Sequence, residues 1–328
     1  MKWPALLGVL IGLGLAITLI AANDVGRVTQ ALVGAGWGVL LVIAARPPQT
    51  LASALAWRAL VREDGARLSD YVLFRWVREG VNALLPAAGV GGDMVRARLL
   101  AQRGVSLKVA SASAAVDLSL EMASQIVFAL IGVAALVLSR PGVDALGWVM
   151  GVTVLGAVIA GSFMASQRFG LFKLVEKGLI RASEREGWSS LGDMTGLHDA
   201  VVAMYRDPRR FWISAAWHLA SWMLGVLELW AALYVLGIHA DWREALIIES
   251  LGQAVRGLGF AIPGALGVQE GGYLLICGLF GIPPQQALAV SLLRRVRDLA
   301  LGLPALAVWH RIEDRRFARK MAAAGEQS

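Results

Sequence analysis

Six mainly apolar runs, each about as long as a membrane-spanning helix, constrain the fold of this chain more than any other feature. A helix that crosses the hydrocarbon core needs about 20 mainly apolar residues. The runs cover residues 4–22, 34–61, 109–138, 145–166, 211–237 and 286–309. Of the 328 residues, 57% are hydrophobic and 17% are charged, a balance that soluble domains rarely reach. We therefore expect a polytopic, all-α integral membrane protein.

Two further apolar stretches, 69–103 and 245–281, are interrupted near their middles by proline and glycine. A broken helix inside a membrane has to be sheltered by protein or to line a wet cavity, because its freed backbone groups need partners. We expect each stretch to form a re-entrant hairpin. The expected fold therefore has about six full transmembrane helices and two broken hairpins.

The two broken stretches align when the chain is shifted by 177 residues. The shift places Pro86 on Pro263, Asp93 on Glu270, Gly80 on Gly257, Gly104 on Gly281, Asp117 on Arg294 and Glu121 on Asp298. Three full spans separate the two stretches. Because this number is odd, the second stretch enters the membrane from the side opposite to the first. This predicts an inverted-topology repeat, in which the broken helices of many transporters meet near the midplane at the substrate site. A simple kink at PGALG is the alternative interpretation.

The basic residues are concentrated in alternate loops. The loops 23–33, 139–144 and 238–244 contain a single arginine each, whereas 167–210 and the C-terminal tail are rich in Lys and Arg. The positive-inside rule then places both termini in the cytoplasm. We expect membrane halves at 1–166 and 211–310, a cytoplasmic amphipathic linker at 167–210 and a basic tail at 311–328. The run 4–22 is interpreted as a retained helix, not as a cleaved signal peptide.

Several classes of function are disfavoured by the residues present. The net charge of +7 comes with no nucleic-acid-binding motif. Cys277 is the single cysteine, and the four histidines lack metal-ligand spacing. There is no nucleophile elbow or nucleotide-binding loop in a strand–helix context. We expect no enzyme activity, no cofactor or metal, and no nucleic-acid partner.

Charged residues also lie inside the apolar spans. Asp117 and Glu121 share one helical face, and Arg294, Arg297 and Asp298 lie in the corresponding part of the second half. A charge at the bilayer centre costs on the order of 2.5–3.5 kcal/mol, so these groups should pair or face water. One interpretation is a salt-bridge seam between the two repeats. The other is that the arginines bind an anionic head group and that the carboxylates balance them when the site is empty.

Two motifs carry a resemblance to a known family. The segments NALLPAAGVGGDMVRARLL (82–100) and IPGALGVQEGG (262–272) resemble the lysylphosphatidylglycerol synthase transmembrane-region family. In length and layout the chain is similar to the hopanoid-biosynthesis-associated membrane proteins of that family. The resemblance implies a protein of the bacterial inner membrane that moves a lipid between leaflets. The sequence holds no soluble aminoacyltransferase domain, so lysyl transfer is not implied. The family motifs map onto Asn82, Pro86, Gly91, Gly92, Asp93, Arg96, Pro263, Gly264, Gly267 and Glu270.

The favoured hypothesis is a lipid flippase that binds the polar head group where the hairpins meet, with Glu270 lining the cavity. A transporter of a small soluble anion, an intramembrane lipid-modifying enzyme and a non-transporting scaffold of a lipid-biosynthesis complex are the alternatives. Lipid-biosynthesis proteins and a second copy of the chain stay open as partners, as does the identity of the lipid. The candidate site comprises Asn82, Pro86, Gly91, Gly92, Asp93, Arg96, Asp117, Glu121, Arg256, Pro263, Gly264, Gly267, Glu270, Arg294, Arg297 and Asp298.

Overall fold

The computed structural model describes most of the chain between residues 25 and 325. The described residues are 14, 17–19, 21–23, 25–63, 65–85, 91–139, 147, 151, 154, 196–259 and 262–325. Within them every regular element is a helix, which agrees with the expected all-α class. The elements are α2 (Val25–Gly34), η1 (Gly36–Gly38), α3 (Val39–Leu60), α4 (Leu68–Leu84), α5 (Gly91–Ala101), α6 (Leu107–Ser139), α9 (Leu197–Tyr205), α10 (Pro208–Val235), α11 (Trp242–Leu258), η3 (Pro263–Ala265), α12 (Val268–Gly278) and α13 (Pro284–Gly325).

Within the described part of the chain, three helical segments are long and apolar enough to cross a membrane: Gly36–Leu60, α6 and α10. They coincide with the predicted spans 34–61, 109–138 and 211–237. The predicted span 286–309 falls within α13, whose 42 residues form one helix. At 1.5 Å per residue this helix is about 63 Å long, roughly twice the thickness of the hydrocarbon core. The predicted spans 4–22 and 145–166 lie largely outside the described residues.

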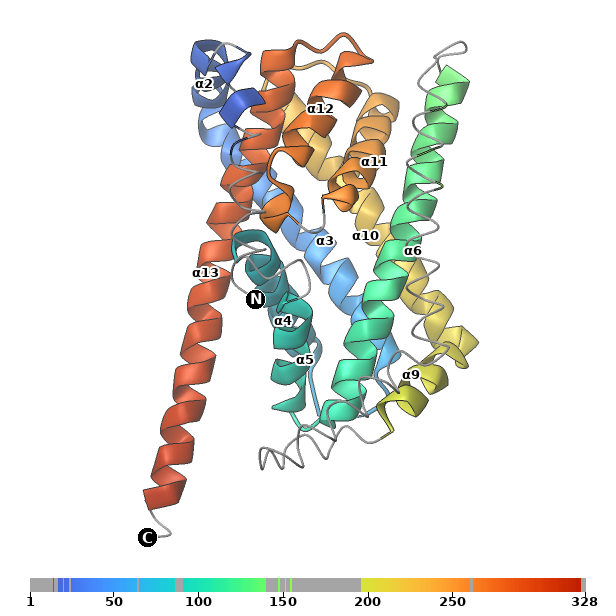
Figure 1. Ribbon diagram of the computed structural model, residues 1–328, viewed down its shortest axis with the longest axis vertical. Helices are drawn as coiled ribbons and strands as arrows, with labels where there is room; N and C mark the ends of the chain where they lie inside the picture. Colours follow the sequence, from blue (N-terminus) through green and yellow to red (C-terminus); the bar gives the residue numbers. More distant parts are fainter. Residues whose placement is uncertain are drawn as a thin grey trace.

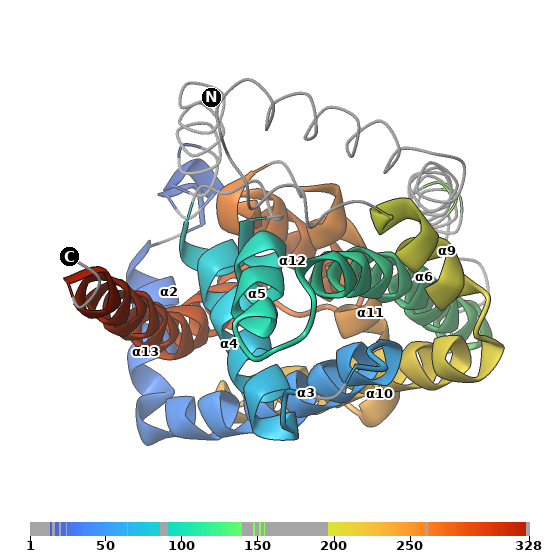
Figure 2. The ribbon, with the colours of Figure 1, turned by 90° about the horizontal axis from the view of Figure 1, so that it is seen from below.

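The long helices form the frame of the molecule, and the short broken pairs fill it from opposite ends (Figure 1). Helices α3 and α10 lie side by side, along the lower edge of the view in Figure 2. The pair α4–α5 occupies the lower half of Figure 1, and α11–α12 occupies the upper half. The first helices of the two pairs have 17 residues each and the second helices have 11 each. Both breaks fall inside the stretches where the sequence predicted them.

Local sequence explains where several of these helices begin. Asp207 caps α10 by accepting a hydrogen bond from the backbone N–H of Arg210 (3.2 Å), and Pro208 occupies the first helical turn. Asp241 and Glu244 form a reciprocal capping box at the start of α11. Each cap satisfies N–H groups that the first turn of a helix leaves without intrahelical partners.

The two larger apolar cores of the described residues lie above and below a polar layer. The upper core contains Phe128 of α6 and Val290 of α13, together with side chains of α10, α11 and α12. The lower core contains Ala114 of α6 and side chains of α3, α4 and α5, and Trp309 of α13 packs against it. Helices α6 and α13 therefore contribute to both cores with opposite ends. The charged residues near the middle of these two helices lie between the cores.

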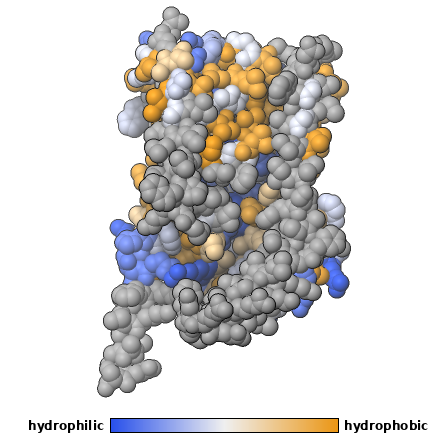
Figure 3. Space-filling view, viewed as in Figure 1, coloured by the Kyte–Doolittle hydropathy of each residue, from blue (hydrophilic) through white to orange (hydrophobic). Residues whose placement is uncertain are grey.

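The described helices of the predicted halves 1–166 and 211–310 pack against each other. Helix α13 of the second half packs against α2, α3 and α4 of the first, and α3 packs along α10. The predicted linker 167–210 contains α9, which packs against α6, while residues 167–195 lie outside the described part. In the space-filling view, hydrophobic residues cover much of the upper part of the face, and hydrophilic residues gather toward the lower end (Figure 3).

Candidate functional site

The polar layer contains equal numbers of positively and negatively charged side chains among the described residues. Among the described residues, the eight arginines of the layer are paired with eight carboxylates, so their formal charges cancel. Pairing and mutual neutralisation are what permit so many charges inside a bundle of apolar helices. The members are Arg46, Arg75, Arg78, Arg96, Arg256, Arg294, Arg295, Arg297, Glu79, Asp93, Asp117, Glu121, Glu228, Glu249, Glu270 and Asp298.

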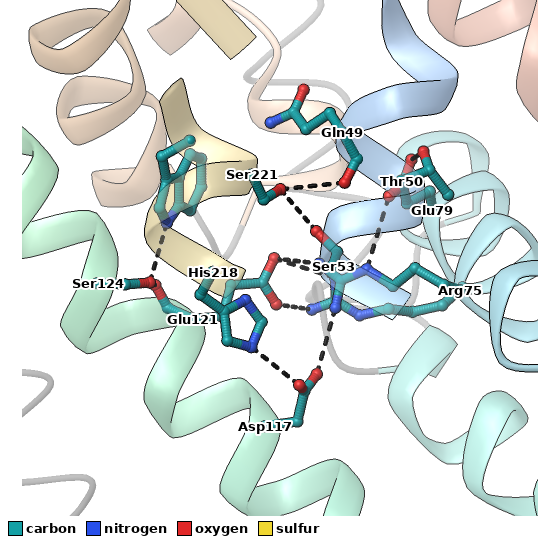
Figure 4. Close-up of polar contacts among 12 residues, drawn as sticks. Gln49, Thr50, Ser53, Arg75, Glu79, Asp117, Glu121, Ser124, His218 and Ser221 are labelled. Atoms are coloured by element: carbon teal, nitrogen blue, oxygen red, sulfur yellow. Dashed lines mark hydrogen bonds and ion pairs between the residues drawn. The ribbon is translucent and has the colours of Figure 1, made fainter. Parts of the chain in front are cut away.

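Asp117 is the centre of the network on the α4–α5 side. Its carboxylate accepts hydrogen bonds from Arg96 (2.6 Å) and Arg75 (3.3 Å), and His218 of α10 lies 2.9 Å from its other oxygen. Figure 4 shows Arg75, Asp117 and His218 converging from three different helices. Arg96 is fully buried and also lies over the ring of Trp57, 4.6 Å from its centroid. Asp117 is therefore held from α4, α5 and α10 at once.

Glu121, one helical turn beyond Asp117, joins the same network. It pairs with Arg75 (2.6 Å) and with Arg78 (2.9 Å). Arg78 in turn donates to Asp93 (2.8 Å), which also pairs with Arg96 (2.7 Å). Arg78 of α4 thereby joins Asp93 of α5 to Glu121 of α6.

Arg294 is the corresponding centre on the α11–α12 side. It contacts Glu228 of α10 at 3.1 Å and donates to Glu249 of α11 and to the hydroxyl of Tyr273 of α12. Arg297 pairs with the same Glu228 at 3.0 Å. The buried Glu228 thus balances two arginines of α13.

Arg46 of α3 connects the two sides. Its guanidinium lies 3.1 Å from Glu79 on the α4 side and 3.6 Å from Glu228 on the other side. The predicted seam paired Asp117 and Glu121 directly with Arg294 and Arg297, and that pairing is not found among the described residues. Asp117 and Glu121 pair instead with arginines of α4 and α5, whereas Arg294 and Arg297 pair with Glu228 of α10. Arg46 bridges these two clusters.

The first break places Gly91, Gly92 and Asp93 at the start of α5. The side-chain oxygen of Asn82 accepts a hydrogen bond from the backbone N–H of Gly92 (2.9 Å), which joins the two sides of the break. A Cβ on Gly92 would lie 2.5 Å from the carbonyl oxygen of Arg78, so this close approach of α4 and α5 requires glycine. Pro86 and residues 87–90 lie outside the described residues.

The second break is held by Glu270. Its carboxylate accepts hydrogen bonds from the backbone N–H of Gly267 (2.7 Å), from Ser291 (3.0 Å) and from Arg295 (3.0 Å). Arg295 also donates to the carbonyl of Gly264 (2.6 Å), in the short helix η3 that begins at Pro263. Gly264 and Gly267 adopt positive φ of 62° and 77°, which glycine tolerates without strain.

A cavity of about 310 Å³ opens within the polar layer. It lies where α4, α6 and α10 face the end of α11 and the second break, and Trp76 and Trp222 form part of its wall. Its charged lining among the described residues is Arg46, Arg75, Arg78, Arg256, Arg297, Glu79, Glu121 and Asp298.

The cavity separates the sequence-predicted site residues into two groups. The lining includes six of them: Asn82, Glu121, Arg256, Gly264, Arg297 and Asp298. Among the described side chains, the lining does not include Gly91, Gly92, Asp93, Arg96, Asp117, Gly267, Glu270 and Arg294. The side chain of Pro263 lies outside the described part. The expectation that Glu270 lines the cavity is therefore corrected: its oxygens are used by the helix cap, Ser291 and Arg295, and it is 1% exposed.

Arg75, Glu249 and His218 are central to the network but were absent from the sequence-predicted site. Arg75 and Glu249 lie in the broken stretches, and a charge in an apolar segment that needs a partner is the signal by which the sequence could have identified them. His218 is buried within α10 and carried no motif.

The polar groups that line the cavity are suited to binding a ligand. Guanidinium groups donate paired hydrogen bonds to oxyanions, and Gln49, Gln125 and Gln253 add neutral polar groups to the wall. Within the described part of the chain, no group of three His, Cys, Asp or Glu side chains is arranged to hold a metal ion. Such a surface suits a polar or anionic group surrounded by apolar helices.

Comparison with known proteins places the chain in a family. Residues 5–305 match the family model described as "Lysylphosphatidylglycerol synthase TM region". A UPF0104 membrane protein of Methanothermobacter thermautotrophicus is similar to the chain, with 25% identity over 266 residues, or 74% of each sequence. No solved structure matches. The chain is a multi-pass integral membrane protein that belongs to the lysylphosphatidylglycerol synthase transmembrane-region family.

Proposed function

We propose that this protein moves a lipid between the leaflets of its membrane, with the polar head group in the central cavity and the acyl chains outside it. One observation carries the proposal: a cavity of about 310 Å³, rich in arginine, lies between two apolar cores of a membrane protein. Buried charges are costly, and inside membranes they commonly mark substrate pathways. A scaffold has no need of such a cavity.

We further propose that α4–α5 and α11–α12 are re-entrant hairpins related as an inverted-topology repeat. Equal helix lengths, placement at opposite ends of the molecule and the matched surroundings of Asp117 and Arg294 support this relation. Moving one hairpin relative to the other would then expose the cavity alternately to each leaflet, as in other transporters built from inverted repeats. The proposed location is the bacterial inner membrane with both termini cytoplasmic. A link to hopanoid or aminoacyl-phospholipid metabolism stays a prediction of the family resemblance.

The test is a leaflet-specific quenching assay. The purified full chain is reconstituted into phosphatidylcholine vesicles that contain a trace of phospholipid with a fluorescent head group, and a membrane-impermeant quencher is added. We expect quenching of inner-leaflet lipid at a rate well above that of protein-free vesicles. A second set of vesicles is loaded with radiolabelled inorganic phosphate. Release of phosphate without lipid movement would contradict the proposal and identify a transporter of a soluble anion.

A further inference from the structure

Asp298 lies between two arginines of the cavity without bonding tightly to either. One carboxylate oxygen faces Arg297 at 3.4 Å, and the other faces Arg256 at 3.8 Å. These distances exceed those of ordinary charge-assisted hydrogen bonds. Other pairs in the layer are closer, such as Arg96 with Asp117 at 2.6 Å and Arg78 with Asp93 at 2.8 Å. Among the carboxylates of the layer, Asp298 is thus the one whose nearest arginine is farthest away, and Arg256 has no ion-pair contact shorter than 3.8 Å among the described residues.

Both arginines retain hydrogen-bonding capacity. The Nε and Nη2 atoms of Arg297 have no hydrogen-bond acceptor in the described part of the protein, although the side chain is only 2% exposed. Its Nη2 is near Glu228 without the geometry of a hydrogen bond. Arg256 has 27% of its side chain exposed and Asp298 as its one charged neighbour within 4 Å among the described residues. Buried donors without acceptors are costly, so a ligand that supplies acceptor oxygens here would be stabilised.

We propose that the Asp298 carboxylate occupies the place of a phosphate group, and that Arg256 and Arg297 bind the phosphate when it displaces Asp298. A carboxylate with one oxygen toward each guanidinium presents the pattern that two oxygens of a phosphate would present. The planar fork of arginine matches phosphate oxygens, so two forks around one point favour a phosphate over a neutral polar group. The assignment of this phosphate to a lipid head group rests on the proposed function.

The internal carboxylate gives the site a distinctive response to substitution. Arg256→Gln removes a donor and should weaken phosphate binding about ten- to hundredfold, the value of a charge-assisted hydrogen bond. Asp298→Asn keeps the volume but removes the competing negative charge, so it should strengthen binding by about tenfold or more. If Arg256 and Asp298 were only a structural pair, both substitutions would change the phosphate affinity in the same direction.

The measurement uses the purified full chain with two probes. Binding of inorganic phosphate is followed by the shift of the thermal-unfolding midpoint, with chloride at matched ionic strength as the blank. Retention of phosphatidylglycerol against a phosphate-free galactolipid is followed by native mass spectrometry. The matched controls are Arg98→Gln and Glu313→Gln, which alter an exposed arginine–carboxylate pair at 2.9 Å outside the cavity, and both should bind as wild type.

The outcomes separate this inference from the proposed function. Opposite shifts of Arg256→Gln and Asp298→Asn with both probes support a phosphate site that accepts a lipid. Opposite shifts with inorganic phosphate and no selective retention of phosphatidylglycerol support the site but contradict the lipid function. If both folded variants change the phosphate affinity in the same direction, or neither changes it, the inference is overturned. If Arg256→Gln does not fold, Arg256→Lys and Asp298→Asn are compared instead. Wild-type phosphate affinity of Asp298→Asn is then enough to contradict the displacement of Asp298 by phosphate.

Discussion

Asp117 and Arg294 occupy the same position in their helices and are held in the same way with the charges reversed. Asp117 is the eleventh residue of α6, counted from Leu107, and Arg294 is the eleventh of α13, counted from Pro284. Asp117 is bonded by Arg75 and Arg96, from the first and second helices of the lower pair. Arg294 is bonded by Glu249 and Tyr273, from the first and second helices of the upper pair. Asp117 therefore joins α4 and α5 to α6, and Arg294 joins α11 and α12 to α13.

We expect the contacts of Asp117 and Arg294 to stabilise the folded protein. Arg294→Met would leave Glu249 buried without its arginine, and removal of one partner of a buried pair typically costs about 3–5 kcal/mol. Detergent-solubilised Arg294→Met should unfold at a clearly lower temperature, whereas Arg98→Met, in an exposed pair, should change stability by about 0–1 kcal/mol. The double variant Arg294→Met/Glu249→Gln should recover part of the loss. Equal stability of Arg294→Met and Arg98→Met is the result that contradicts this account.

Glu270 is expected to act by positioning the second break, because its oxygens are already used by Gly267, Ser291 and Arg295. Glu270→Gln removes the charge that holds Arg295 and should lower stability by about 1–3 kcal/mol while slowing lipid movement. Glu244→Gln is the matched control, since Glu244 occupies the same capping position in α11 at the surface. That variant should cost much less. Wild-type stability and transport of Glu270→Gln would show that this carboxylate does not support the break.

The proposed inverted repeat predicts opposite accessibility of the two short helices. In a Cys277→Ser background, Arg98→Cys on α5 should react with a membrane-impermeant thiol reagent from the cytoplasmic side. Gly278→Cys on α12 should react from the other side, where its Cβ meets open space. The native cysteine is buried, so its removal serves only to lower the background. Reaction of both positions from one side would rule out opposite entry of the hairpins.

The start of α10 should respond to acid. A hydrogen bond from Arg62 holds the pKa of Asp207 below its ordinary value. Because the folded-state pKa is the lower one, this group contributes stability above its ordinary pKa, and the contribution is lost as pH falls through the folded-state value. The difference in unfolding midpoint between wild type and Asp207→Asn should therefore be present at neutral pH and shrink in acid. A difference that does not change with pH would contradict this linkage.

The positions of spans and breaks could be predicted because their causes are local. Hydropathy over about 20 residues identified 34–61, 109–138 and 211–237, and proline and glycine identified both breaks. The presence of buried charge at Asp117 and Arg294 was likewise evident from the sequence, because any charge in an apolar span needs a partner.

The partners themselves could not be predicted, since they depend on how distant helices pack. Arg75 and Asp117 are 42 residues apart, and Asp117 and His218 are 101 apart. The sequence left open whether the charges of the two halves pair with each other or bind a head group. The structure pairs most charges within each side and uses Arg46 as the bridge. Likewise, Asp93 and Glu270 matched each other in sequence, but both are used at helix starts behind the cavity wall.

The most direct test of the central claim is to fill the cavity without altering a charge. Gly257 lines the cavity, and a Cβ there would lie 3.1 Å from the flexible end of Gln125. Gly257→Leu should fold, because leucine favours a helix more than glycine does, and it should occupy the space proposed for the head group. Gly278→Leu, on the open outer side of α12, is the control. In the leaflet-specific quenching assay we predict loss of lipid movement in Gly257→Leu and wild-type movement in Gly278→Leu. Wild-type movement in well-folded Gly257→Leu would contradict passage of the head group through this cavity.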